Sequence, residues 1–199
     1  MILVLCCPRT GSSLVAKIIA MHGVYTGEIV KNKFGYTEYE NTAIKIISKQ
    51  QWVNYNRYRT KEFGVAMEPS KQHLQNVRNV VEKDIPDGQE WLFKTMAELY
   101  PLFLQFNPKI ILVKRNEESS VASIKEKHPK DEKEYIRGIY KTRMVLMEYI
   151  KKHHGAVWVD TDKLVQKDFT DIRNAVEYCG LEFNPEITDK AIDLKLWRH

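Results

Sequence analysis

Cysteine is scarce in this chain: the 199 residues include three, Cys6, Cys7 and Cys179. An odd number of cysteines without C-x-x-C spacing indicates neither a disulfide framework nor a zinc site. Long apolar runs are missing as well. The opening run, Met1 to Cys6, is too short for a membrane span or for the apolar part of a signal peptide. These absences predict a cytoplasmic protein without a membrane span.

The sequence also lacks a block of like charge, an internal repeat and a low-complexity tract. Its 31 Lys and Arg residues are mixed with 26 Asp and Glu residues, which leaves a formal net charge of +5. This mild excess favours anionic ligands, but basic residues are not gathered as nucleic-acid binding requires. With 43% hydrophobic and 29% charged residues, the chain is predicted to form a single globular domain over residues 1–199.

The sequence does contain a regular alternation of apolar runs and amphipathic stretches. Unbroken apolar runs are typical of strands covered on both faces, and 3.6-residue spacing is typical of helices. The predicted strands are Met1 to Cys6, Trp91 to Lys94, Lys109 to Lys114 and Ala156 to Asp160. The predicted helices cover residues 14–22, 38–50, 71–83, 97–106, 116–127, 131–154, 161–165 and 170–179. This order predicts an α/β fold, with helices on both faces of a central parallel sheet.

A polar turn, Pro8-Arg9-Thr10-Gly11-Ser12-Ser13, lies between the first strand and the first helix, and we name it the anion loop. The first turn of a helix presents unpaired N–H groups and the positive end of its dipole. Arg9 adds a cation, Gly11 permits a close approach of the backbone, and the hydroxyl groups add donors. The loop is therefore a candidate phosphate or sulfate site. The alternative is an ordinary polar helix N-terminus.

The anion loop differs from the nucleotide phosphate loop, G-x-x-x-x-G-K-[ST]. Cys6 stands where that motif has its first Gly, and Ser12 stands where it has its Lys. The cation lies before the Gly instead, at Arg9. We therefore do not expect this loop to hold a γ-phosphate and Mg²⁺ in the usual way.

A second candidate site follows the apolar strand 110–113. Arg115 comes at its end, and Ser123 lies eight residues later in the next predicted helix. An arginine that reached along the helix would contact the same phosphate as that hydroxyl. The alternative is an arginine that is solvated at the end of its strand.

Glu28 is predicted near the carboxyl end of a short extended segment, the edge at which open α/β sheets bind ligands. It is either a catalytic carboxylate or a solvated loop residue. Residues 29–70 are the least regular part of the sequence, and their aromatic side chains either line an acceptor pocket or pack beneath a long loop.

Together these segments resemble the sulfotransferase family that uses 3′-phosphoadenosine-5′-phosphosulfate (PAPS). The anion loop is similar to the family's P-R-[ST]-G-[ST]-[ST] motif, and residues 110–123 resemble its 3′-phosphate segment. Shorter similarities are Gly35-Tyr36 with Glu38 to G-Y-x-E, residues 159–164 to Y-E-D-L, and 179–181 to the late F-L-G-L. The order of these motifs extends from one end of the chain to the other.

The resemblance implies a P-loop-like, three-layer sulfotransferase fold and transfer of a sulfuryl group from PAPS to a hydroxyl or amine. The product would be 3′-phosphoadenosine-5′-phosphate (PAP), and no metal would be required. By position, the whole anion loop would bind the 5′-phosphosulfate: Pro8, Arg9, Thr10, Gly11, Ser12 and Ser13. Arg9 would also stabilise charge on the leaving phosphate. Arg115 and Ser123 would bind the 3′-phosphate.

The sequence departs from the family at its usual base. Members that act on small phenols and steroids carry K-T-H, in which the histidine is the base, whereas this chain has Lys94-Thr95-Met96. Methionine cannot accept a proton, so the base lies elsewhere or is dispensable. Protein-tyrosine sulfotransferases use a Glu that follows a similar G-E stretch, so the resemblance makes Glu28 the candidate base and Glu38 the second. Lys94 matches a family lysine near the transferring group and is a candidate for assisting catalysis.

Two other functions remain open. A P-loop nucleotide-dependent kinase would use 157–160 as a Walker B strand, although it would lack the loop lysine. A non-catalytic nucleotide-binding protein would explain Met96. If the chain is a sulfotransferase, the resemblance implies that residues 29–90 bind the acceptor, a small molecule, saccharide or lipid head group.

Overall fold

The computed structural model describes residues 1–27, 45 and 66–192. The predictions for Glu28, Glu38 and Gly35-Tyr36 lie outside these residues, as does most of the predicted helix 38–50, of which Lys45 is described as helical. No helix in the described part of the chain is both long and apolar enough to cross a bilayer.

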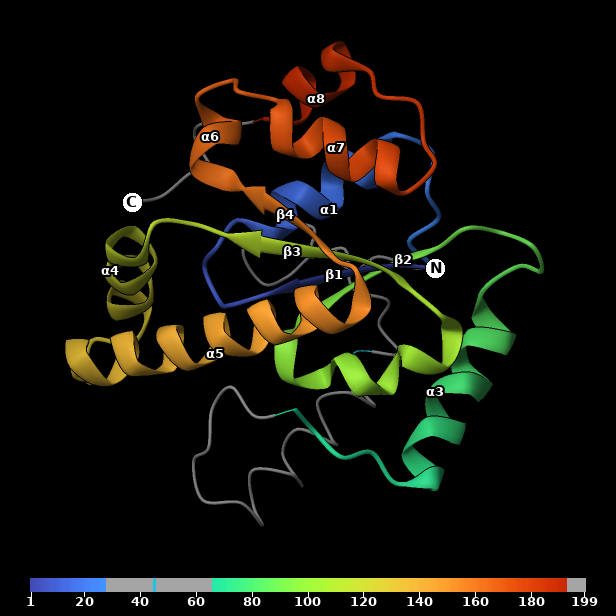
Figure 1. Cartoon of the computed structure of the whole chain (residues 1–199), viewed down its shortest axis with the longest axis horizontal. Helices are drawn as coiled ribbons and strands as arrows, with labels where there is room; N and C mark the ends of the chain where they lie inside the picture. Colours follow the sequence, from blue (N-terminus) through green and yellow to red (C-terminus); the bar gives the residue numbers. More distant parts are fainter. Residues whose placement is uncertain (28–44, 46–65, 193–199) are drawn as a thin grey trace.

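A four-stranded parallel sheet forms the centre of the fold, with the strand order β2-β1-β3-β4 (Figure 1). The strands are β1 Ile2–Cys6, β2 Leu92–Met96, β3 Lys109–Lys114 and β4 Val157–Asp160. The register aligns Met96 and Val113 with Cys6, and Val159 with Val113. All four strands therefore end at one edge, which we name the carboxyl edge.

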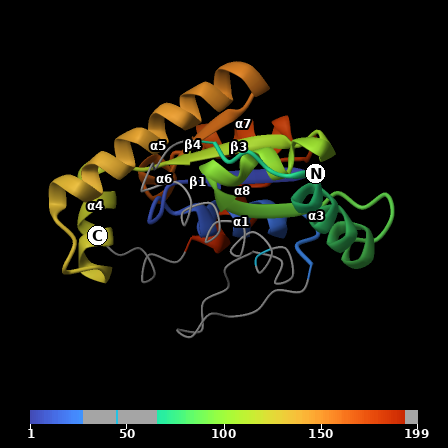
Figure 2. The same cartoon turned by 90° about the horizontal axis from the view of Figure 1, so that it is seen from below.

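Helices cover both faces of this sheet. One face carries α1 Ser12–Met21, α7 Thr170–Tyr178 and α8 Pro185–Ala191. The other carries α3 Lys71–Asp84, the 3₁₀ helices η1 Ala97–Leu102 and η2 Leu104–Phe106, and α5 Lys133–His154. Two further helices, α4 Glu117–Lys127 and α6 Thr161–Val165, follow β3 and β4 at the carboxyl edge (Figures 1 and 2). The predicted α/β fold is confirmed.

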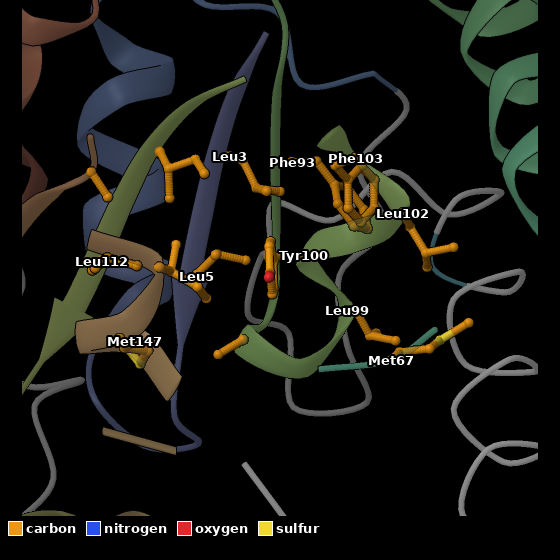
Figure 3. Packing of buried hydrophobic residues seen from close by; sticks show 14 of the residues in the cluster. Leu3, Leu5, Met67, Phe93, Leu99, Tyr100, Leu102, Phe103, Leu112 and Met147 are labelled. Carbon is orange, nitrogen blue, oxygen red and sulfur yellow. The ribbon is translucent and has the colours of Figure 1, made fainter. Parts of the chain in front are cut away.

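The alternation of side chains along the strands divides the core into two parts. Leu3, Leu5 and Leu112 pack against α5 and the 3₁₀ helices, together with Tyr100 and Met147 (Figure 3). Their neighbours in sequence pack against α1 and α7 on the other face: Ile2, Val4, Ile111 and Val113. Because β1 and β3 are buried on both faces, an unbroken apolar run was the correct signal for them.

The predicted helix over 97–106 is wrong in type. The structure has two 3₁₀ helices there, and Pro101 lies inside the first. Proline has no N–H to donate to the carbonyl four residues earlier, and its ring clashes with that carbonyl, which disfavours an α-helix. Helix α8 was not predicted, although Asn184 caps it by accepting from Glu186 N and Pro185 occupies its first turn.

A buried ion pair joins η1 to α5. Arg143 Nε lies 2.5 Å from Glu98 Oε1, and the exposed fractions of the two side chains are 6% and 0%. The backbone carbonyl of Glu98 also accepts from Met67 N at 2.9 Å. This pair fixes the segment that follows β2 against the long helix.

We expect Glu98→Gln to lower the free energy of unfolding by about 3 kcal/mol, because it leaves a buried guanidinium without its counter-charge. The control is Asp189→Asn, since Asp189 pairs with Lys167 at 2.8 Å with both side chains about half exposed. That change should cost less than about 1 kcal/mol. Urea unfolding of both variants measures the difference, and equal effects would contradict a structural role for the buried pair.

Candidate functional site

The anion loop leaves the carboxyl end of the central strand β1. The Thr10 hydroxyl donates to the carbonyl of Cys7 at 2.8 Å, and Thr10 is fully buried. This internal hydrogen bond stabilises the turn. Arg9 and Gly11 have positive φ angles of 66° and 80°. Glycine adopts this conformation without strain, whereas a non-glycine residue such as Arg9 is held there by its surroundings.

Helix α1 begins at Ser12 with its backbone amides directed at the loop. No side chain caps this end of α1, and no acidic residue lies in its first turn. By contrast, α3 is capped by Ser70 and α4 by Asn116. Ser12 is buried and Ser13 is half-buried. This N-terminus therefore keeps the donors and the positive dipole that an anion requires.

Arg9 reaches across the carboxyl edge to α4. Its Nε donates to Ser123 Oγ at 2.9 Å, although 114 residues separate the two in sequence. Arg9 is exposed and Ser123 is almost fully buried. The structure thus joins the anion loop to the segment that resembles a 3′-phosphate site.

Arg115 follows β3 directly, and its side chain is buried. Its Nε lies 3.5 Å from Asp162 Oδ1, while the other carboxylate oxygen of Asp162 accepts from Asn116 N at 2.6 Å. Arg115 and Ser123, which sequence spacing predicted to meet on one phosphate, thus have partners on different elements: Asp162 at the start of α6 and Arg9 in the anion loop.

The end of β2 carries Lys94 and Met96. Lys94 is 8% exposed and stands in register with Val4, two residues before the end of β1. Met96 Sδ lies 3.8 Å from a guanidinium nitrogen of Arg143. Glu98, two residues after Met96, is fully buried and pairs with Arg143, so it anchors this corner of the structure.

Cys7 lies beneath the anion loop. Burial raises the pKa of its thiol, and the nearby Arg143 offsets only part of that effect. Its Sγ contacts Met147 Sδ at 4.0 Å. Cys7 therefore stays protonated at neutral pH and packs as a small apolar side chain, not as a nucleophile.

Three residues at the carboxyl edge were not identified from the sequence. Thr161 Oγ1 contacts the carbonyls of Thr10 and Lys114, Asp162 contacts Arg115 and Asn116, and the Tyr140 hydroxyl donates to Arg115 O at 2.5 Å. Burial raises the pKa of Tyr140 to about 12, so it remains a donor at neutral pH. The sequence placed Thr161 and Asp162 directly after the predicted strand 156–160. No local pattern indicated which residues they would contact.

The anion loop, which follows β1, and Arg115, which follows β3, lie at a topological switch point of the sheet. The helix that follows β1 covers one face of the sheet, and the long helix that follows β3 covers the other (Figure 2). Ligands of open α/β sheets bind at such points, outside the carboxyl ends of the strands. Among the described residues, no group of three His, Cys, Asp or Glu side chains is arranged to hold a metal ion.

No protein-family model matches the chain, and no curated protein sequence is significantly similar to it. Solved structures do match. The sulfotransferase domain of the Synechococcus PCC 7002 olefin synthase has a TM-score of 0.61 and 13% identity, over 97% of this chain and 77% of that one. The sulfotransferase domain from the curacin biosynthetic pathway has a TM-score of 0.54 and 11% identity, over 94% and 76%.

A third match is retinol dehydratase, solved in complex with androsterone and the inactive cofactor PAP. It has a TM-score of 0.55 and 11% identity, and the alignment covers 96% of this chain but 62% of that one. At these identities the likeness concerns the course of the backbone. The α/β architecture built around β1 and β3 is therefore the sulfotransferase fold.

Proposed function

We propose that this protein is a sulfotransferase that moves a sulfuryl group from PAPS to a hydroxyl or amine of an acceptor and releases PAP. The observation that carries the proposal is the contact of Arg9 with Ser123 beside the uncapped N-terminus of α1, together with Arg115 at the end of the neighbouring strand β3. Two separate cationic segments suit a nucleotide with phosphates at both its 5′ and 3′ positions.

In this proposal the anion loop binds the 5′-phosphosulfate. Gly11, Ser12 and Ser13 offer main-chain and hydroxyl donors, and Arg9 offers a guanidinium. Pro8 and Thr10 shape the turn, the latter through its bond to the Cys7 carbonyl. Arg115 and Ser123 bind the 3′-phosphate, and this mode of binding needs no metal ion.

The residues present fit the proposed chemistry. When bound, PAPS supplies the sulfuryl group. An acceptor oxygen forms a bond to sulfur as the bond between sulfur and the phosphate oxygen breaks, and that oxygen keeps the electron pair. Arg9 and the α1 amides stabilise the growing negative charge on the phosphate. The proton of the acceptor goes to Glu28 or, second, to Glu38.

We assign acceptor binding to residues 29–90, which connect α1 to β2. The acceptor is a small molecule, a saccharide or a lipid head group that carries the hydroxyl or amine. Androsterone in the retinol dehydratase complex, a small hydroxyl-bearing molecule, supports the first of these classes.

We predict that PAP binds with micromolar affinity in the absence of metal, more tightly than AMP, ADP or ATP. Arg115→Ala should weaken PAP about tenfold to hundredfold and leave AMP nearly unchanged, because AMP lacks the 3′-phosphate. Arg9→Ala should weaken both. Titration calorimetry measures each affinity.

The control for these titrations is Arg78→Ala, which removes the same charge from an exposed position on α3, at the far end of the molecule from α4 (Figure 1). It should leave PAP binding unchanged. Binding of ATP that depends on Mg²⁺, without binding of PAP, would instead support a nucleotide-dependent kinase.

We predict that Glu28→Gln lowers kcat by about 10²- to 10⁴-fold, because the amide cannot accept the acceptor proton. Glu38→Gln should have a smaller effect. Release of PAP from PAPS is followed with a panel of hydroxyl and amine acceptors. Neither change should alter the Kd for PAP. A protein that binds PAP but turns over no acceptor would be a non-catalytic nucleotide-binding protein.

We further predict that Lys94→Met lowers kcat about a hundredfold with little change in the Kd for PAP, because the charge acts near the transferring group. Methionine matches the length of the lysine stem in this buried strand position. Lys94→Arg keeps the charge and should recover part of the activity. Equal kcat values for both variants would remove Lys94 from the catalytic residues.

A further inference from the structure

The turn between β4 and α6 holds a set of contacts that the proposed function does not use. We name Asp160, Thr161 and Asp162 the β4–α6 corner. Asp160 caps α6 by accepting from Asp162 N at 3.0 Å, and its own N–H donates to Asp171 Oδ2 at 3.1 Å. The corner is therefore fixed by the side chain of Asp160 and by Asp171 on α7.

Thr161 connects this corner to two other segments. It is fully buried, and its hydroxyl oxygen lies 2.8 Å from the carbonyl of Thr10 and 3.1 Å from the carbonyl of Lys114. A hydroxyl has one proton, so the two carbonyls share a three-centre hydrogen bond. One side chain thereby ties the anion loop to the residue that precedes Arg115.

The segment 114–116 is held from two further directions. Asp162 accepts from Asn116 N and lies near Arg115 Nε, and Tyr140 on α5 donates to Arg115 O. The anion loop, by contrast, is joined to this network through Thr161 and through the contact of Arg9 with Ser123. Of these two links, the one at Thr161 is buried and the one at Arg9 involves an exposed side chain.

We propose that Thr161 is a positioning residue that sets the distance between the two anion-binding segments. This inference rests on the proposed function, because it concerns a ligand that bridges both segments. A ligand with two phosphates gains affinity from the second only when both subsites stand at the correct separation. A small displacement of one subsite therefore costs more for such a ligand than for one with a single phosphate.

Amide hydrogen exchange of the ligand-free protein tests the positioning role. In Thr161→Val, which keeps the shape but loses the hydroxyl, residues 10–12 and 114–116 should exchange about tenfold faster. Thr161→Ser restores the donor and should restore protection. The matched control is Thr188→Val, because Thr188 is equally buried but bonds to Asn184 at the start of its own helix.

Unchanged exchange in both segments of Thr161→Val would overturn the inference. Equal acceleration in Thr188→Val would overturn it too, since it would indicate general destabilisation. Because this readout uses no nucleotide, it tests whether Thr161 holds the two segments in place even if the protein does not bind PAP, an outcome that would reject the proposed function.

Calorimetry with PAP, 3′-AMP and 5′-AMP supplies the second readout. Thr161→Val should weaken PAP about tenfold and each mononucleotide less than about threefold. Thr161→Ser should bind all three like the original protein. If all three ligands weaken by the same factor, or if none weakens, Thr161 does not couple the two segments.

Discussion

The candidate site depends on the parallel pairing of β1 with β3. This pairing aligns Cys6 with Val113, so the anion loop and Arg115 leave the sheet at the same level. The chain then turns to opposite faces, toward α1 after β1 and toward α5 after β3. The anion loop and the segment that contains Arg115 are distant in sequence but are thereby brought to the same edge of the sheet, and the burial of both strands holds them rigidly.

At the carboxyl edge, side chains satisfy backbone groups where the strand ladder stops. The carbonyls of Cys7, Lys114 and Arg115 accept from the hydroxyls of Thr10, Thr161 and Tyr140. Each such bond adds only about 1 kcal/mol, but an unpaired buried carbonyl costs more than that. The hydroxyls therefore fix the backbone that carries Arg9 and Arg115 and help to hold the positive φ of Arg9, which costs roughly 1–3 kcal/mol.

Local sequence patterns were sufficient to predict the α/β fold, the strands β1 and β3, and the turn that forms the anion loop. An unbroken apolar run indicates a strand buried on both faces, and a cluster of Gly, Ser and Thr indicates a turn, and both signals lie within a few residues. Pro101, inside the segment 97–102, disfavours an α-helix there although the surrounding pattern is helical. The contacts of Arg9 with Ser123 and of Thr161 with Thr10 join residues 114 and 151 positions apart. Their geometry follows from strand order and register, which short-range patterns do not specify.

Three carboxylates near the carboxyl edge are held by other groups. Asp160 caps α6, Asp162 pairs with Arg115, and Glu98 pairs with Arg143. Each of these carboxylates is already committed, whereas Arg9 contacts the neutral Ser123 and keeps its charge available to an anion. This distribution of charge suits the stabilisation of negative charge. In the proposed reaction, a group that removes a proton would come from another segment, and Glu28 and Glu38, between α1 and α3 in the sequence, are our candidates.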